Sequence, residues 1–337
     1  MIHVLFIWKV QDELKKYITQ GLKDIKVDLI FPEEAQEEIY LKHASVADII
    51  VGWRPSKELL AKAKKLRLFI NPGAGVQHLL ELFDNIKKKR DVVLVNGHGN
   101  SYFTAQHIVG ILLALMNKII PHHSWMVEGK WRLGDTEAKS IPLRDKRIGL
   151  LGYGNVNKKV HRFLSSFDVS FSILRKHWNK DRSYAFPTSC QKYEFVQLHE
   201  FLKEIDILIV AIPLTSDTEG LIGNNELRLL RKNGLLVSAG RGAVIDEESL
   251  YEALKNNVIA GAAIDVWYDY KPEPDDKGRQ FPTQFPFYEL NNVVLSPHRA
   301  ASPFDDLRRW DEVIENITRF VRGEKKFLNE VNVEEGY

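Results

Sequence analysis

The chain has 337 residues, of which 44% are hydrophobic and 27% charged, and its formal net charge is +2. This length suggests two domains of ordinary size, and the near-neutral charge does not indicate nucleic-acid binding. The single cysteine, Cys190, excludes an internal disulfide and suits a reducing compartment. The first residues resemble a strand rather than a signal peptide, and no stretch is long and apolar enough for a membrane span. We therefore expect a soluble cytoplasmic protein.

The first part of the chain alternates short apolar runs with amphipathic segments. The apolar runs, read as five strands, are HVLFIW (3–8), KVDLIF (26–31), ADIIVGW (47–53), RLFINP (67–72) and VVLVN (92–96). Parallel strands buried on both faces are continuous apolar runs, and the helical patterns between them provide the crossovers. This part of the sequence predicts a doubly wound α/β domain.

A second series of apolar runs follows. It comprises RIGLLGYG (147–154), VSFSIL (169–174), DILIVAIP (206–213), GLLVSAG (234–240), AGAAIDVW (260–267) and NVVLSPH (292–298). Helical patterns separate most of these runs as well. The fold class is therefore α/β, with two doubly wound parallel-sheet domains.

The domain boundaries are expected where the strand series stop. The first series ends near Asn96, and a long helical pattern follows it. The last helical segment lies beyond the second series and can return to the first domain. We expect one domain from 1–96 and 302–337 and the other from 97–301. The Pro-rich stretch 268–287 interrupts the second series, and long loops of this kind are often functional.

A glycine-rich turn connects the first strand of the second series to a helix. Gly152 permits the tight turn, and Gly154 allows the backbone to approach a pyrophosphate. The helix that begins near Asn155 and Val156 offers free N–H groups and the positive end of its dipole. Asn157 replaces the third glycine of the fingerprint. A purely structural turn is the alternative interpretation.

The next strand ends in three potential cations, Arg175, Lys176 and His177. In this fold an acidic residue at that place binds the ribose 2′-hydroxyl of NAD, whereas an Arg suits the 2′-phosphate of NADP. The planar fork of a guanidinium matches phosphate oxygens. We predict that NADP(H) is preferred and that NAD(H) is possible, with a solvated basic turn as the alternative.

Several further segments complete one pattern. Together with GYGNV and DILIVAIPLTSDTEGLI, they resemble the D-isomer-specific 2-hydroxyacid dehydrogenase family over nearly the whole chain. These segments are NPGAGVQHL (71–79), NGHGNSYFTAQH (96–107), SAGRGAVIDEESLYEAL (238–254) and LSPHRAAS (295–302). The resemblance implies a flavodoxin-like substrate domain, a Rossmann-type dinucleotide-binding domain and a cleft between them. Within the family, NADP-preferring glyoxylate and hydroxypyruvate reductases are relatives compatible with Arg175 and the small-residue loop. Relatives that oxidise phosphoglycerate, formate or phosphite stay open as alternatives.

Reduction of a 2-keto acid needs a cation for the carboxylate and a proton donor for the carbonyl oxygen. Arg241 follows a strand end, and the resemblance gives it the carboxylate and the polarised carbonyl. The resemblance makes His298 the general acid and base, a task that suits imidazole because its pKa lies near neutrality. Asp265 resembles the family's carboxylate beside the nicotinamide carboxamide, with an ordinary turn Asp as the alternative.

The carboxylate partner of the catalytic histidine departs from the family pattern. The family has Glu five residues after the Asp of its D-V motif, and that position is Tyr270 here. Glu273 lies three residues later and can take the role if the loop bulges, and Asp269 is another candidate. The remaining possibility is that His298 has no such partner.

The remaining site predictions follow from the resemblance and from strand ends. Trp53 and Arg54 lie at the end of the strand 47–53 on the predicted cleft side, where Arg54 can recognise a second substrate charge or be an ordinary surface residue. Cofactor contacts are expected at two further strand ends, and substrate contacts are expected in the first domain, where backbone N–H groups of a small-residue loop bind the carboxylate. The cofactor residues are Ala211, Ile212, Pro213, Ala239 and Gly240, and the substrate residues are Ala74, Gly75, Trp53, Arg54 and Asn100. No metal site is expected.

The leading hypothesis is an NADP(H)-dependent reductase of a small 2-keto acid that yields the D-2-hydroxy acid. A nucleotide-sensing binding protein, as in corepressor members of the superfamily, is the alternative. The resemblance also implies a homodimer whose arm covers about 101–140, with Trp125 and Trp131 on an exposed apolar face. We expect no nucleic-acid or membrane partner.

Overall fold

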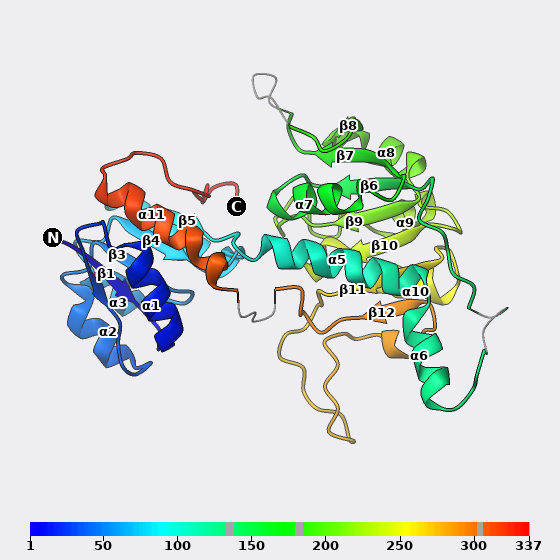
Figure 1. Cartoon of the computed structure of the whole chain (residues 1–337), viewed down its shortest axis with the longest axis horizontal. Coiled ribbons are helices and arrows are strands. Elements are labelled where there is room, and N and C mark those ends of the chain that lie inside the picture. Colours follow the sequence, from blue (N-terminus) through cyan, green and yellow to red (C-terminus); the bar gives the residue numbers. More distant parts are fainter. Residues whose placement is uncertain (133–135, 137, 179–184, 302–305, 337) are drawn as a thin grey trace. The chain divides into compact units, whose positions relative to one another are not determined.

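The computed structural model describes residues 1–132, 136, 138–178, 185–301 and 306–336. The chain divides into two compact units (Figure 1). The first unit comprises Met1–Asn100 and Pro303–Tyr337, and the second comprises Ser101–Ser302. The first division therefore falls at Asn100 rather than at the expected residue 96.

The first unit contains a five-stranded parallel sheet in the order β2-β1-β3-β4-β5. Its strands are β1 (Ile2–Phe6), β2 (Val27–Ile30), β3 (Ile49–Val51), β4 (Leu68–Asn71) and β5 (Val93–Asn96). Helices α1 (Asp12–Gly21) and α11 (Asp311–Val321) bury apolar side chains on one face of this sheet. Helices α2 (Glu37–Ala44), α3 (Lys57–Lys62) and α4 (Gln77–Lys87) do so on the other. The strand order reverses at β1 and β3, where ligands bind in open α/β sheets.

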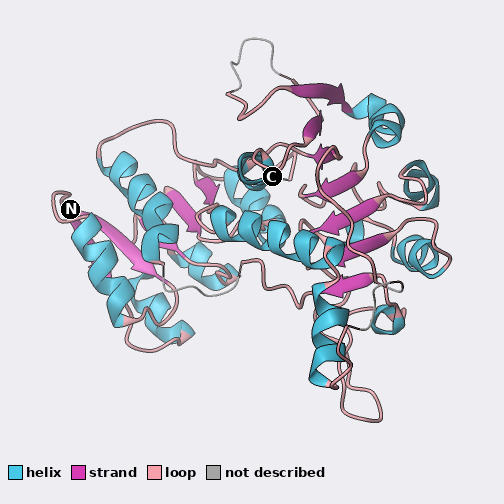
Figure 2. Cartoon of the chain, turned by 45° about the vertical axis from the view of Figure 1, so that its right-hand side comes forward, coloured by secondary structure: helices cyan, strands magenta, loops and turns pink. Residues whose placement is uncertain are grey.

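The second unit contains a seven-stranded parallel sheet in the order β12-β11-β10-β9-β6-β7-β8. Figure 2 shows strands in magenta with helices in cyan beside them. Its strands are β6 (Arg147–Leu151), β7 (Ser170–Arg175), β8 (Cys190–Glu194), β9 (Ile207–Val210), β10 (Leu235–Ser238), β11 (Gly261–Ile264) and β12 (Val293–Leu295). Helices α5 (Ser101–Met116) and α7 (Asn155–Leu164) pack on one face. Helices α8 (Leu198–Glu204), α9 (Asn224–Leu229) and α10 (Glu247–Lys255) pack on the other. The two doubly wound parallel sheets confirm the expected fold class.

One strand of the second unit was absent from the sequence-based prediction. The edge strand β8 pairs with β7 over Cys190–Glu194, and its residues are exposed or half-buried. A partly exposed edge strand needs no continuous apolar run, so the pattern used to find the buried strands could not detect it.

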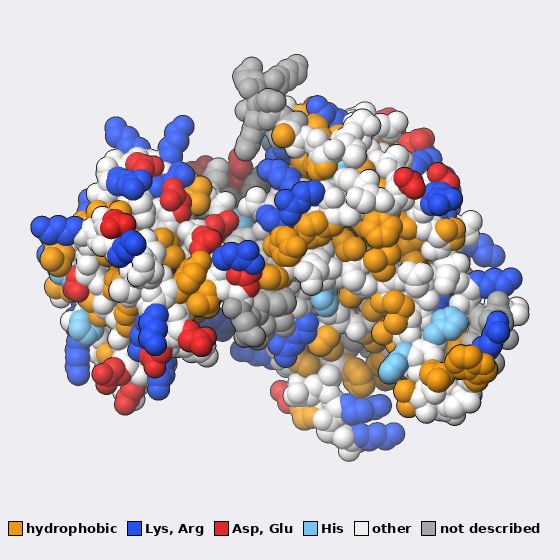
Figure 3. All heavy atoms as spheres, viewed as in Figure 1, with side chains coloured by type: hydrophobic (Ala, Val, Ile, Leu, Met, Phe, Trp, Pro, Cys, Tyr) orange, Lys and Arg blue, Asp and Glu red, His pale blue; other side chains and the backbone are white. Residues whose placement is uncertain are grey.

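Helix α6 (Ile119–Val127) follows α5 after Lys118, whose φ of 54° lies in the left-handed region. None of the residues of α6 is buried, and hydrophobic side chains are visible over it in Figure 3. Among the described helices, none is by itself long and apolar enough to cross a membrane. The pair α5 and α6 reaches that length only together, with a bend of 64° at the break.

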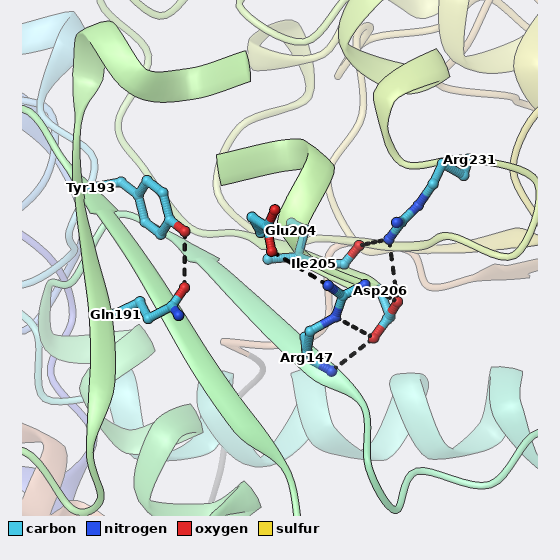
Figure 4. Close-up of polar contacts among 7 residues, drawn as sticks. All are labelled: Arg147, Gln191, Tyr193, Glu204, Ile205, Asp206 and Arg231. Atoms are coloured by element: carbon cyan, nitrogen blue, oxygen red, sulfur yellow. Dashed lines mark hydrogen bonds and ion pairs between the residues drawn. The ribbon is translucent and has the colours of Figure 1, made fainter. Parts of the chain in front are cut away.

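An ionic network joins strands at the amino-terminal edge of the second sheet (Figure 4). The Asp206 carboxylate, just before β9, accepts hydrogen bonds from the Arg147 guanidinium at 3.0 and 3.2 Å. It also accepts one from Arg231 at 3.3 Å. The functional residues are predicted at the carboxyl ends of the strands, whereas this network lies at the opposite, amino-terminal edge. We therefore assign the network a structural role in the sheet.

Candidate active site

The glycine-rich turn lies between β6 and α7, as predicted. Gly152 has a φ of +82°, and a side chain there would collide with Ile212. An added Cβ at Gly154 would meet nothing within 4 Å, so the backbone is open to a ligand there. Within the described structure, the N–H groups of Asn155 and Val156 at the start of α7 have no hydrogen-bond acceptor. Open space and unpaired N–H groups at a helix N-terminus fit the pyrophosphate of a dinucleotide.

Asn157 has a positive role in this turn. It is fully buried, and its Nδ2 donates to the carbonyl oxygens of Leu151 (3.0 Å) and Gly152 (2.8 Å). The side chain therefore fixes the end of β6 to the first turn of α7. The Leu151 and Gly152 peptide groups, which Asn157 joins to α7, shape the phosphate loop. The loop therefore keeps a fixed conformation although Asn157 replaces the third glycine.

The three predicted cations lie at the end of β7, with Arg175 its last residue, and they differ in their surroundings. The Arg175 guanidinium carbon lies 5.4 Å from the centroid of the Trp178 ring, which is a cation–π contact. The Lys176 ammonium forms an ion pair with Asp217 at 2.8 Å, and His177 is exposed. Asp217 belongs to the loop that follows β9. Because an aromatic ring fixes its guanidinium, Arg175 is the best placed of the three for a directed contact with phosphate.

The exits of β9 and β10 are packed closely together. A Cβ on Gly240 would lie 2.7 Å from the carbonyl oxygen of Ile212, so this approach requires glycine. The Ala239 N–H donates to Val210 O at 3.1 Å, which aligns the two strand ends. The predicted cofactor residues Ala211, Ile212, Pro213, Ala239 and Gly240 therefore form one continuous stretch of the sheet's carboxyl edge.

Arg241 and His298 lie on this same edge, after β10 and β12. Arg241 Nη1 donates to the carbonyl oxygen of Gly240 at 2.8 Å. His298 has a φ of 55°, and its N–H donates to Ser296 O at 3.0 Å. By surface area His298 is exposed, yet enough protein surrounds the ring to desolvate it in part. This desolvation lowers the pKa of His298, the charge of Asp265 opposes the shift, and the charge of Arg241 adds to it.

Asp265 holds the segment that carries His298. Its carboxylate is fully buried and accepts hydrogen bonds from the Ser296 hydroxyl, the Arg299 N–H (2.7 Å) and the Ala300 N–H (3.0 Å). Burial raises the pKa of this carboxyl, but the hydrogen bonds from His107, Ser296 and the two N–H groups outweigh burial and leave the pKa below its ordinary value. In this structure Asp265 is therefore a charged anchor for the exit of β12.

The predicted carboxylate partner of His298 is not in contact with it. Glu273 is exposed, and no ion pair between it and His298 occurs in the described structure. The ring of Tyr270 instead meets the His298 ring edge to face, with centroids 5.3 Å apart and planes at 61°. Tyr270, which stands where the family has Glu, is thus the side chain that contacts His298. The geometry does not support Glu273 as the carboxylate partner of His298.

In the first unit, the small-residue loop after β4 is held from inside by two amides. Asn71 Nδ2 donates to the carbonyl oxygens of Gly73 (2.5 Å) and Gly75 (3.1 Å), and Asn96 Nδ2 donates to that of Ala74 (2.7 Å). The N–H groups of Ala74 and Gly75 have no acceptor among the described residues. A loop whose carbonyl groups are occupied and whose N–H groups are unpaired can bind a carboxylate.

Trp53 lies beside this loop, at the sheet edge where β1 and β3 end. Its indole nitrogen is 3.3 Å from where a Cβ on Gly73 would stand. It contacts Trp8 and Trp310, with ring centroids 4.9 and 6.1 Å away. Arg54 is exposed, and Asn100 ends the first unit. The predicted Trp53, Ala74 and Gly75 are thus brought together, with two further indoles that sequence reasoning did not single out.

Most of the second unit matches a known protein family. The model of the D-isomer specific 2-hydroxyacid dehydrogenase family, NAD binding domain, matches residues 109–300. The chain belongs to this family. The match covers the phosphate loop, Arg241 and His298, so the predicted family membership and the NAD(P)-binding nature of the second unit are confirmed.

Individual relatives agree with this assignment. A D-3-phosphoglycerate dehydrogenase from Archaeoglobus fulgidus is 31% identical over 246 residues, which are 73% of this chain and 43% of that protein. A glyoxylate reductase from Korarchaeum cryptofilum is 29% identical over 279 residues, which are 79% of this chain and 76% of the relative. The chain thus spans under half of the first relative and about three quarters of the second.

A solved structure extends the fold comparison to the whole chain. The NADPH-dependent glyoxylate/hydroxypyruvate reductase from Sinorhizobium meliloti, in complex with NADP and sulfate, has a TM-score of 0.78 and 22% identity, with 100% of both chains covered. Our chain therefore shares its fold with this solved structure over both of its units, each of which contains a parallel sheet.

Sequence reasoning missed the polar group that supports the family's histidine. His107 on α5 lies with its Nε2 2.8 Å from the Ser296 hydroxyl and 3.4 Å from the Asp265 carboxylate. His107 ends the segment 96–107 that carries part of the family resemblance, but the sequence suggested no role for it. The S-P-H motif contains Ser296, but nothing in the sequence indicated which helix would contact it. Among the described residues, no cluster of His, Cys, Asp or Glu suited to a metal ion is present.

Proposed function

We propose that the protein is an NADP(H)-dependent oxidoreductase that reduces a small 2-keto acid to the D-2-hydroxy acid. The observation that carries the proposal is the common position of the phosphate loop, Arg241 and His298 at the carboxyl edge of one sheet. In open α/β sheets this edge binds ligands, and the strand order reverses beside β6, where the phosphate loop begins. The name of the Korarchaeum relative also supports a keto-acid substrate such as glyoxylate.

The chain's own residues supply binding and proton transfer in this proposal. The chemistry supplied with the cofactor is transfer of a hydride to C2 of the keto acid. Arg241 binds the carboxylate and polarises the carbonyl. In the first unit, the N–H groups of Ala74 and Gly75 are donors that suit a carboxylate. Protonated His298 gives its proton to the carbonyl oxygen as hydride reaches C2, so that the product is a hydroxyl group and His298 becomes neutral.

The preference for NADP(H) rests on the end of β7. Arg175 stands where a carboxylate would select NAD, and its guanidinium is fixed against the Trp178 ring. Lys176 forms an ion pair with Asp217, and this pair neutralises the charge of the Asp217 carboxylate. The 2′-phosphate therefore meets a directed cation rather than an acidic side chain, whereas NAD(H) binds without that contact.

A panel of 2-keto acids assayed with NADPH and with NADH tests this function. We expect reduction of at least one keto acid, with a higher kcat/KM for NADPH, and loss of turnover in the Arg241→Ala and His298→Gln variants with NADPH binding retained. Tight NADPH binding with no turnover on any keto acid would instead favour a nucleotide-sensing protein. A clear preference for NADH would contradict the cofactor assignment.

We also propose that α6 forms a homodimer contact. Val127 at the end of α6 and Trp131 just beyond it are each 74% exposed, and no residue of α6 is buried in this chain. A contiguous exposed apolar surface of this kind favours burial against a partner, and a second copy supplies the same surface. Light scattering at micromolar concentration should give the mass of two chains.

A further inference from the structure

We propose that Tyr270 is the positioning residue for His298, so that proton transfer uses an imidazole held by an aromatic ring rather than by a carboxylate. The inference rests on the proposed function in so far as His298 transfers the proton. The contact between the two rings, the anchoring of Tyr270 and the surroundings of His298 each support it.

The ring contact places Tyr270 directly against the imidazole. The two rings meet edge to face at a centroid distance of 5.3 Å. This is the preferred geometry of aromatic pairs, in which the positive edge of one ring meets the negative face of the other. A contact of this kind restricts the orientation of the His298 ring, whose backbone is already fixed in a left-handed conformation.

Tyr270 is itself anchored to the segment that holds His298. Its hydroxyl oxygen accepts a hydrogen bond from the Trp267 N–H at 3.3 Å. The indole of Trp267 is buried, and its Nε1 donates to the carbonyl oxygen of Ser296 at 2.8 Å. The exits of β11 and β12 are thus connected twice, through Trp267 to Ser296 and through Tyr270 to His298.

Among the described residues, the charged groups that act on His298 do so through their charge and not through an ion pair. Asp265, at the exit of β11, acts on the imidazole through its charge, but its oxygens accept hydrogen bonds from Ser296, Arg299 and Ala300. Arg241, at the exit of β10, opposes protonation of His298. No carboxylate in the described part of the chain forms an ion pair with His298.

The consequence concerns the pH range of the reaction. An aromatic ring orients an imidazole without supplying the negative charge that would stabilise its protonated form. Protonated His298 is therefore a stronger acid than a histidine paired with a carboxylate. Because reduction needs the protonated form, its rate should begin to fall at a lower pH than it would with such a pair. A carboxylate at position 270 would move this decline to higher pH.

The experiment compares three Tyr270 variants of the full chain with wild type. The readouts are the pH dependence of kcat/KM with NADPH and an NMR titration of the His298 ring, assigned by its loss in His298→Gln. Tyr270→Phe keeps the ring but loses the hydroxyl that accepts from Trp267, so its kcat should lie between those of wild type and Tyr270→Leu. Tyr270→Leu should lower kcat by about tenfold with little change in the KM for NADPH. Tyr270→Glu should raise the titration midpoint of His298 by about one pH unit.

Tyr288 provides the matched control. It is 41% exposed, compared with 54% for Tyr270, and its ring stacks on Phe281 rather than on a histidine. Tyr288→Leu and Tyr288→Glu should leave both the titration of His298 and the pH profile as in wild type.

The NMR titration separates failure of this inference from failure of the proposed function. If no keto acid is reduced but the His298 midpoint rises in Tyr270→Glu and not in Tyr288→Glu, the positioning role stands and the function does not. An unchanged His298 midpoint in Tyr270→Glu, or a Tyr270→Phe variant as impaired as Tyr270→Leu, would overturn the positioning role.

Discussion

Asn157 and Gly152 are joined by a hydrogen bond of 2.8 Å from the Asn157 amide to the Gly152 carbonyl oxygen. The same amide also donates to Leu151. A single buried side chain thus ties the strand, the turn and the helix of the phosphate loop together, in the place where a third glycine is usual.

Asn157→Ala should therefore weaken both stability and cofactor binding. Two backbone carbonyl groups lose their partner in a buried site, which costs about 2 kcal/mol of unfolding free energy. The freed turn should raise the Kd for NADPH several-fold. Urea unfolding and fluorescence titration measure the two effects, with Asn155→Ala as a neighbouring control for stability. Unchanged values for both would show that the amide does not define the turn.

Asp265→Asn tests the anchor of the His298 segment. The amide nitrogen would face a donor among Ser296, Arg299 N–H and Ala300 N–H, so a buried hydrogen-bond network is broken. We expect a loss of about 2 to 4 kcal/mol of unfolding free energy and a fall in kcat of about 100-fold. Asp269→Asn, at an exposed position, is the control. A variant with wild-type kcat would remove Asp265 from the support of His298.

The buried His161 should make the unfolding free energy of the protein fall at acid pH. It is fully buried between Tyr153 (2.8 Å) and Thr188 (2.9 Å), and burial lowers its pKa from 6.5 to about 4. The unfolded chain takes up this proton below about pH 6.5, whereas the folded chain resists protonation until about pH 4. The stabilisation is therefore complete above pH 6.5 and is lost as pH falls toward 4.

The size of this effect is about 2 to 3 kcal/mol at pH 4.5. The effect is measured by urea unfolding of wild type and His161→Gln at about pH 7.5 and pH 4.5. The variant has no titrating ring at position 161, and the contributions of the carboxylates cancel in the difference between the two proteins. Wild type should lose more stability than the variant on acidification. Equal losses would mean that His161 is not buried in its neutral form.

Arg175→Ala should change cofactor choice. Removing the guanidinium should lower kcat/KM for NADPH by about 10- to 100-fold and affect NADH much less, since only NADPH carries the 2′-phosphate. The exposed Arg228→Ala on α9 controls for a general loss of positive charge. An equal fall with both cofactors would indicate a structural role for Arg175.

A charge on α6 should disrupt the proposed dimer. Met126 is 57% exposed, so Met126→Glu should fold normally and shift the light-scattering mass toward one chain. Val196→Glu, at an isolated apolar residue that is 90% exposed, should leave the mass unchanged. A Met126→Glu variant that keeps the mass of wild type would place the interface elsewhere.

The fold and part of the site could be predicted because they depend on local pattern. Buried parallel strands are apolar runs, and Gly152, Arg175, Arg241 and His298 lie at the ends of such strands or within three residues of them. Every one of them therefore had to lie at a strand end, and the family resemblance then indicated which chemistry they serve.

The parts that escaped prediction depend on partners far away in sequence. Asn96 supports Ala74, and His107 meets Ser296 across 189 positions in the chain. Such pairs are created by the order of the strands and by helix packing, which periodicity does not encode. The contact of Tyr270 with His298 is similar, because a departure from a motif says what is absent and not what takes its place.

The amides of Asn71 and Asn96 have one more consequence. They orient the peptide groups of residues 73–75 without any ionisable side chain. A carboxylate bound there is recognised by fixed dipoles, which do not titrate. Recognition of the acid group should then be insensitive to pH from roughly 5 to 9, so the pH profile of turnover reports the ionisation of a single side chain.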